Sequence, residues 1–181
     1  MWNIATPSRF TQNYRGGYDR FYDESFDEAS RMRMSAAGYR DAIMSAVPIF
    51  AAARDLDTGE RVVKDIQQAK GIMDSLLLMK SISGTTEDQF QHALIQIIQI
   101  ASKGKGQMQD LRSILESGGH MGEFLARYGF GTSIGGMISK SSQGKLLGSE
   151  MLRNLASASS RETLAKRQEM SRRTWEDVGI I

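Results

Sequence analysis

The side chains able to act as general bases or metal ligands are few in this chain and far apart. Histidine occurs only at positions 92 and 120, and neither has a carboxylate at the spacing that a metal site or an acid–base pair uses. His92 falls on the polar side of a predicted helix, where we interpret it as a solvated surface residue. The acidic pairs Asp27–Glu28 and Glu87–Asp88 fall in first turns of predicted helices, where they compensate the helix dipole. We therefore predict no catalytic residue and no metal ligand, and expect that the protein is not an enzyme.

Two glycine-rich segments are partly similar to phosphate-binding loops. GFGTSIGG, residues 129–136, has the wrong glycine spacing for a dinucleotide loop, and no predicted strand precedes it. SQGK, residues 142–145, has Ser139 where a phosphate loop has its first glycine and Leu146 where it has a magnesium-binding hydroxyl. We interpret both segments as turns and expect no cofactor and no small-molecule substrate.

Composition favours helix nearly everywhere. The chain has 181 residues, 40% hydrophobic and 24% charged, which is enough for one ordinary core or two small ones. Only two prolines occur, alanine, glutamine, methionine and leucine abound, and alternating β-branched residues are missing. We predict an all-α protein, a compact bundle of short and medium helices with an extended, charged C-terminal helix.

Charge and cysteine content exclude several other classes of protein. The net charge of +2 comes from 23 basic and 21 acidic residues, so no strong overall field attracts nucleic acid or anionic lipid. Absence of cysteine excludes disulfides and fits a reducing compartment. The start, MWNIATPSRF, lacks the pattern of a secretory signal, and no apolar run approaches the roughly 20 residues that cross a bilayer.

The N-terminal part is predicted to be irregular before the helices begin. Residues 1–24 mix aromatic residues with glycine and show no helical period. We interpret them as an irregular arm packed on its own domain or frayed, with a partner-binding arm as the alternative. A helix is predicted from Ser25 to about Ala37, with Gly38 as its stop.

Two longer helices are predicted to follow. The first covers about residues 39–54 and contains Pro48, which we expect to kink or restart it. The segment DLDTGER forms a turn, and apolar residues at spacings of three and four then predict a helix over about 59–82. The eleven methionines are interpreted as core filling, with an adaptable binding groove as the alternative.

The next predicted helix starts after the break at Ser83-Gly84, with Thr85 or Thr86 as its cap. Its polar strip consists of Gln89, His92, Gln96, Gln99 and Lys103. The centre of its apolar face consists of Phe90, Leu94, Ile97, Ile98 and Ala101, and Ile95 and Ile100 widen the face on its flanks. So wide a face predicts contact with two neighbours, and thus the central helix of the bundle.

The segment SKGK, residues 102–105, ends that helix. Lys103 and Lys105 lie at its negative end, and Gly104 and Gly106 allow the chain to reverse into a helix over about 107–116. We interpret SKGK as a helix C-cap, with an anion-binding loop as the alternative.

The remaining elements are predicted to be short, over 121–128 and 133–139. From Gly148 onward the sequence is highly charged with few apolar residues, which is more typical of a connector or coiled-coil strand than of a core helix. The predicted organisation is thus an arm over 1–24, a compact domain over 25–146 and a charged helical extension over 147–181.

One ordered set of residues resembles the N-terminal helical domain of the tape measure proteins of long-tailed bacteriophages. The set is a helix ending in Gln and Ser-Lys-Gly-Lys, followed by an acidic residue, Leu and Arg. It consists here of Gln99, Ser102, Lys103, Gly104, Lys105, Asp110, Leu111 and Arg112. The upstream helices and LARYGF followed by MISKSSQGKL are similar to that family as well. The chain departs from the family at Gly106, where a β-branched residue is usual, and at residues 117–120, where proline-glycine is common.

The resemblance implies a structural function without chemistry. A tape measure protein is a long helical protein, present in several copies in the lumen of the virion's tail, whose length sets tail length. It is assembled in the bacterial host cytoplasm and leaves when DNA is ejected. The implied partners are the tail tube, tail tip or baseplate proteins, tail assembly chaperones and further copies of the same chain, with nucleic acid contacted only transiently.

Two other functions stay open. A helical adaptor or regulator could bind nucleic acid through basic turns, using Lys103, Lys105, Arg112, Arg127, Lys140 and Lys145. A helical muramidase would need a buried acid in a cleft, which the sequence does not supply.

Overall fold

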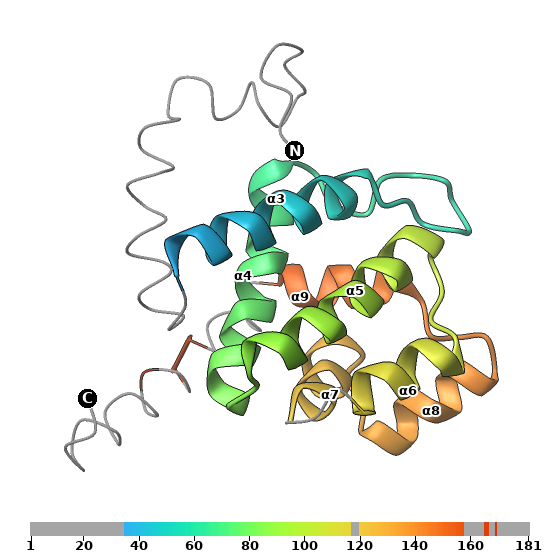
Figure 1. Cartoon of the computed structure of the whole chain (residues 1–181). Coiled ribbons are helices and arrows are strands. Elements are labelled where there is room, and N and C mark those ends of the chain that lie inside the picture. Colours follow the sequence, from blue (N-terminus) through green and yellow to red (C-terminus); the bar gives the residue numbers. More distant parts are fainter. Residues whose placement is uncertain (1–34, 117–119, 158–164, 167–168, 170–181) are drawn as a thin grey trace.

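The computed structural model describes residues 35–116, 120–157, 165, 166 and 169. It contains seven α-helices and the π-helix η1 in that part of the chain, and no strand there (Figure 1). They are α3 (Ala36–Ala52), α4 (Ile66–Ser83), α5 (Glu87–Lys103), α6 (Met108–Glu116), α7 (Met121–Phe124), η1 (Leu125–Gly129), α8 (Ile134–Ser142) and α9 (Gly148–Ala156). Their apolar sides share one core, which confirms the all-α, multi-helix prediction. The predicted arm over 1–24, the helix start at Ser25 and nearly all of residues 158–181 lie outside the described residues.

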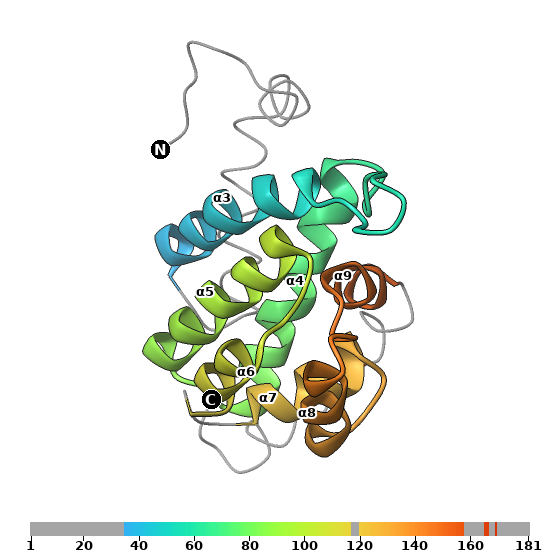
Figure 2. The ribbon, with the colours of Figure 1, turned by 90° about the vertical axis from the view of Figure 1, so that its right-hand side faces the viewer.

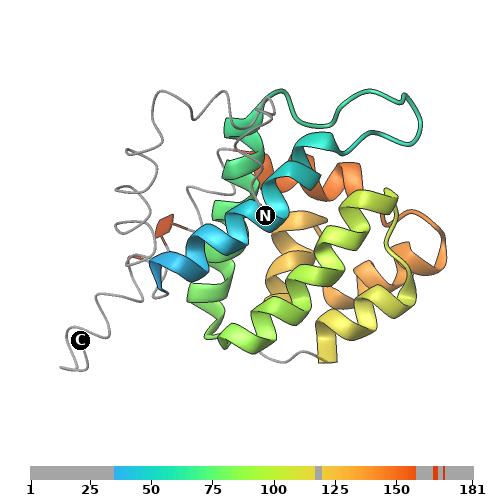
Figure 3. The same ribbon diagram turned by 45° about the horizontal axis from the view of Figure 1, so that its top comes forward.

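The helix α4 is flanked by α3, α7 and α9. In Figure 1, α3 and α5 lie side by side on the face toward the viewer and α4 passes behind them. Figure 2 shows α9 beside α4, with α6, α7 and α8 grouped at the lower end of the molecule. In Figure 3 the loop between α3 and α4 extends outward at the top. The described fold is thus a bundle whose two ends differ, one made by long helices and one by short helices.

The most buried helix is α4 rather than α5. Eleven of its residues are buried, and it contacts α3, α7 and α9. Its Ser75 hydroxyl donates to the carbonyl oxygens of Gly71 and Leu155, at 3.0 and 2.9 Å, which joins α4 to the end of α9. The helix α5 contacts α3, α6 and α9, so it has the two neighbours that were predicted and a third, but only six of its residues are buried and Ile95 is 51% exposed. The prediction of a wide apolar face is right at Ile100, which is fully buried, and wrong at Ile95.

The helix α3 differs from its prediction at Gly38 and at Pro48. Ser35 caps α3, and its hydroxyl oxygen accepts from the Gly38 amide at 3.0 Å. Because the cap uses that amide, Gly38 lies in the first turn of α3, and its predicted role as a helix stop is wrong. Pro48 lies on the exposed side within α3, and the helix continues past it to Ala52 without restarting.

The helix predicted over 59–82 starts later, at Ile66. Asp65 caps it by accepting from the Gln68 amide at 2.8 Å, and the Gln68 side chain accepts from the Lys64 amide at 2.8 Å. Val63 is buried although it precedes the helix. The apolar spacing continues through the loop because the loop covers the core too, so the predicted start was wrong.

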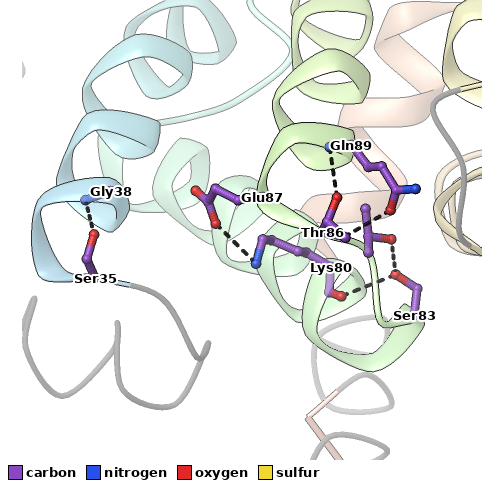
Figure 4. A network of polar contacts seen from close by, with 8 residues as sticks. Ser35, Gly38, Lys80, Ser83, Thr86, Glu87 and Gln89 are labelled. Atoms are coloured by element: carbon purple, nitrogen blue, oxygen red, sulfur yellow. Dashed lines mark hydrogen bonds and ion pairs between the residues drawn. The ribbon is translucent and has the colours of Figure 1, made fainter.

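The start of α5 follows the predicted signals. Gly84 ends α4 with φ 69°, and Thr86 forms a reciprocal capping box with Gln89, with distances of 3.3 and 3.0 Å (Figure 4). The adjacent Glu87 carboxylate lies 3.3 Å from the ammonium group of Lys80, which is itself 6.0 Å from the centre of the Phe90 ring. The buried Lys80 is thereby paired at the junction of two helices.

The helix from Gly148 onward belongs to the core over its described length. Met151, Leu152 and Leu155 are fully buried, and α9 contacts α4, α5 and η1. Its charged residues Glu150 and Arg153 lie on the other side and pair with Lys140 and Asp55, each at 2.7 Å. A connector interpretation is therefore wrong for residues 148–156, because charge on one side obscured a complete apolar stripe on the other.

Five methionines of the described helices fill the core as predicted, whereas Met108 of α6 is 38% exposed. Those fully buried are Met73, Met79, Met121, Met137 and Met151. No described helix is both long enough and apolar enough to cross a membrane.

Candidate functional site

The segment that carries the family resemblance begins with the end of α5. Gly104 has φ 84°, a left-handed conformation, and its amide donates to the Ile100 carbonyl at 2.9 Å. Lys103 lies in the last helical turn, where its charge opposes the negative helix end. The C-cap interpretation of SKGK is confirmed, since glycine adopts this conformation without the strain that a Cβ atom causes.

Asp110 links that helix end to the start of α6. It is only 3% exposed, and its Oδ2 accepts from the Gln107 amide at 2.9 Å. Its Oδ1 lies 3.7 Å from the Lys103 ammonium group. One carboxylate therefore caps α6 and pairs with the last turn of α5.

The other motif residues divide between core and surface. Leu111 is fully buried and Gln99 is half-buried, whereas Ser102, Lys105 and Arg112 are exposed. The buried members serve packing and the exposed members line the outside of the turn.

The second lysine-glycine segment, SQGK, pairs with the first. The Gly106 amide donates to the Leu146 carbonyl at 2.7 Å, and the Gly148 amide donates to the Gly104 carbonyl at 2.9 Å. Lys105 and Leu147 thereby form an antiparallel bridge. We call residues 104–106 and 146–148 the paired turns; their two chain segments run side by side at the right of Figure 1. The sequence indicated each turn separately but gave no signal that they meet.

The paired turns approach closely because two positions have no side chain. A Cβ atom at Gly148 would lie 2.6 Å from the Ile100 carbonyl oxygen, and one at Gly106 would overlap the Leu146 side chain. Gly104 is covered by Leu56, whose Cγ would lie 2.6 Å from an added Cβ. Glycine at 106 is where the chain departs from the family, and here it makes room for the second turn.

The six basic residues considered for nucleic-acid binding do not form one cluster. Lys103 pairs with Asp110, and Lys140 pairs with Glu150 at 2.7 Å and donates to the Phe130 carbonyl at 3.3 Å. Arg112 lies on α6, and Arg127 lies in η1 with its guanidinium 5.6 Å from the Tyr128 ring centre. Of these six residues, only Lys105 and Lys145 lie near each other, and both are exposed. The Lys105 ammonium group lies 4.0 Å from the position of a Cβ atom built on Gly144, the residue before Lys145.

One of the two histidines lies beside a carboxylate, contrary to the expectation from the sequence. His92 is exposed on α5, and His120 Nδ1 lies 3.2 Å from Glu123 Oε2 with both side chains mostly exposed. Across the described ranges, no cluster of three or more histidine and carboxylate side chains could hold a metal ion.

A hollow of about 450 Å³ lies on the solvent side of the paired turns. We call it the α3–α5 groove. It is lined by Pro48, Ile49, Ala52, Ala53, Arg54, Leu56, Ser102 and Gly104, so that apolar side chains of α3 form one wall and the end of α5 forms the other.

Comparison with known proteins gave no match to a family model, to a curated protein or to a solved structure.

Proposed function

We propose that this chain is a helical domain of a phage tail tape measure protein, acting in tail length determination and tail assembly. The observation that supports the proposal is the role of the residues that carry the resemblance. Gly104 ends α5, Asp110 caps α6, and Leu111 is fully buried. The second lysine-glycine turn of the resemblance is hydrogen-bonded to the first. Each of these roles is structural, as expected for a protein that sets tail length and takes part in tail assembly.

The physical basis of such a function is the constant rise of a helix. A helix extends about 1.5 Å per residue, so the number of residues in a continuous helical rod sets a distance. In this proposal the described bundle is a folded domain of the protein, and the rod lies elsewhere in its sequence. The bundle binds tail tip proteins, tube subunits or assembly chaperones, and the whole protein leaves the tail lumen when DNA is ejected.

The test measures tails in the phage that encodes the chain. In-frame deletion of 100 residues of continuous helix should shorten the tails by about 150 Å in electron micrographs. Peptides of this chain should also be found in purified virions by mass spectrometry. Tails of unchanged length, from virions that lack the chain, would contradict the proposal.

A pair of glycine variants tests the bundle itself in the same phage. Gly148→Leu places a side chain against the backbone of α5 and should abolish normal tails. Gly135→Leu is the matched control, because Gly135 is exposed and a Cβ atom there would meet nothing closer than the Ser133 hydroxyl at 3.8 Å. Normal tails with Gly148→Leu, at equal protein levels, would mean that this domain is not needed for assembly.

The second candidate function is that of a helical adaptor or regulator that binds nucleic acid. It is favoured by the exposed Lys105 and Lys145 side chains at the paired turns. In fluorescence anisotropy with duplex DNA, the double variant Lys105→Glu/Lys145→Glu should then bind more weakly and reduce the salt slope by about 2. The variant Arg61→Glu/Lys64→Glu makes the same charge change at two other exposed positions and is the control. Equal and weak binding by all three proteins would exclude the adaptor.

A further inference from the structure

We draw no further inference here: the strongest candidate, the face formed by α3 and α5 with its exposed Ile95 and the α3–α5 groove, carries nothing because nothing in the structure of the described residues shows what covers it.

Discussion

Two isolated antiparallel bridges occur in the described chain, and they are built in opposite ways. The bridge between Arg54 and Arg61 is local, and polar groups inside its own loop hold it. The Asp55 side chain accepts from the Asp57 and Thr58 amides at 2.8 and 3.3 Å. The bridge between Lys105 and Leu147 joins segments separated by α6, α7, η1 and α8, and it depends on glycines.

This difference predicts how the Arg54–Arg61 loop and the paired turns respond to substitution. A local turn has several hydrogen bonds and open space around it, so losing one side chain leaves the others. The paired turns bring backbone against backbone, and an added methyl group meets atoms that cannot move separately. We therefore expect the largest effects of substitution at the paired turns and the smallest at the Arg54–Arg61 loop.

The largest effect is expected for Gly148→Ala. The new Cβ would lie 2.6 Å from the Ile100 carbonyl oxygen, so α9 must move away from α5. The free energy of unfolding should fall by about 2 to 3 kcal/mol, as measured by urea denaturation. Gly135→Ala, within α8, should instead be neutral or raise stability by up to about 1 kcal/mol. A loss at Gly148 no larger than at Gly135 would mean that the close approach of the two backbones does not limit substitution at the paired turns.

The next effect is expected for Gly104→Ala, at the point where the two regions touch. Alanine at φ 84° is strained, and its Cβ would displace Leu56, so we expect a loss of about 1 to 2 kcal/mol. Leu56→Ala removes the obstacle, and the double variant should recover part of the loss, a coupling of about 0.5 kcal/mol or more. Gly59→Ala is the control, because Gly59 has φ 72° and no atom lies within 4 Å of an added Cβ. This variant should lose only the stability that corresponds to backbone strain at positive φ.

A smaller effect is expected for Asp110→Ala. The change removes the acceptor for the Gln107 amide and the partner of Lys103, and should destabilise the protein by about 1 kcal/mol. Asp110→Asn keeps an acceptor oxygen and should lose less, because Lys103 is 49% exposed and its charge is screened. Equal losses in urea denaturation would assign the effect to charge rather than to capping.

The smallest effect is expected at Asp55, and only in acid. The Arg153 guanidinium, 2.7 Å away, together with the backbone amides of Asp57 and Thr58 lowers the pKa of Asp55 below its ordinary value. A lowered folded-state pKa contributes stability above the unfolded value, and that stability is lost as pH falls through the folded pKa. Melting temperatures from pH 5 downward should therefore decrease less for Asp55→Asn than for the native chain. Parallel curves would mean that the ion pair does not stabilise the fold.

Local chemistry made some elements predictable. Thr86 and Gly84 mark the start of α5 and the end of α4 because a cap and a left-handed glycine depend on near neighbours in sequence. The same reasoning identified Gly104 and the turn toward α6. It misplaced Gly38, because a glycine that ends a helix and one that lies in a first turn look alike until the cap at Ser35 is known.

The pairing of the turns was not predictable from local signals, whereas the burial of α9 was indicated by its apolar stripe and missed because of its charges. Both depend on contacts between distant segments, such as Gly148 against Ile100 and Leu155 against Ser75. The charges of α9 suggested an exposed connector, whereas Glu150 and Arg153 occupy only its outer side. Which side of a helix is buried depends on the elements against which the helix packs.

The paired turns also determine how the described domain responds to a pulling force. The chain enters the paired turns at Gly104 and leaves them at Gly148, and the Gly148 amide donates a hydrogen bond to the Gly104 carbonyl. We therefore expect a force along the chain to break the hydrogen bonds of the paired turns one after another, first this bond and then the bond between Gly106 and Leu146. Because bonds loaded one after another resist little, the mechanical strength of the domain lies in withdrawing α9 from between α4, α5 and η1.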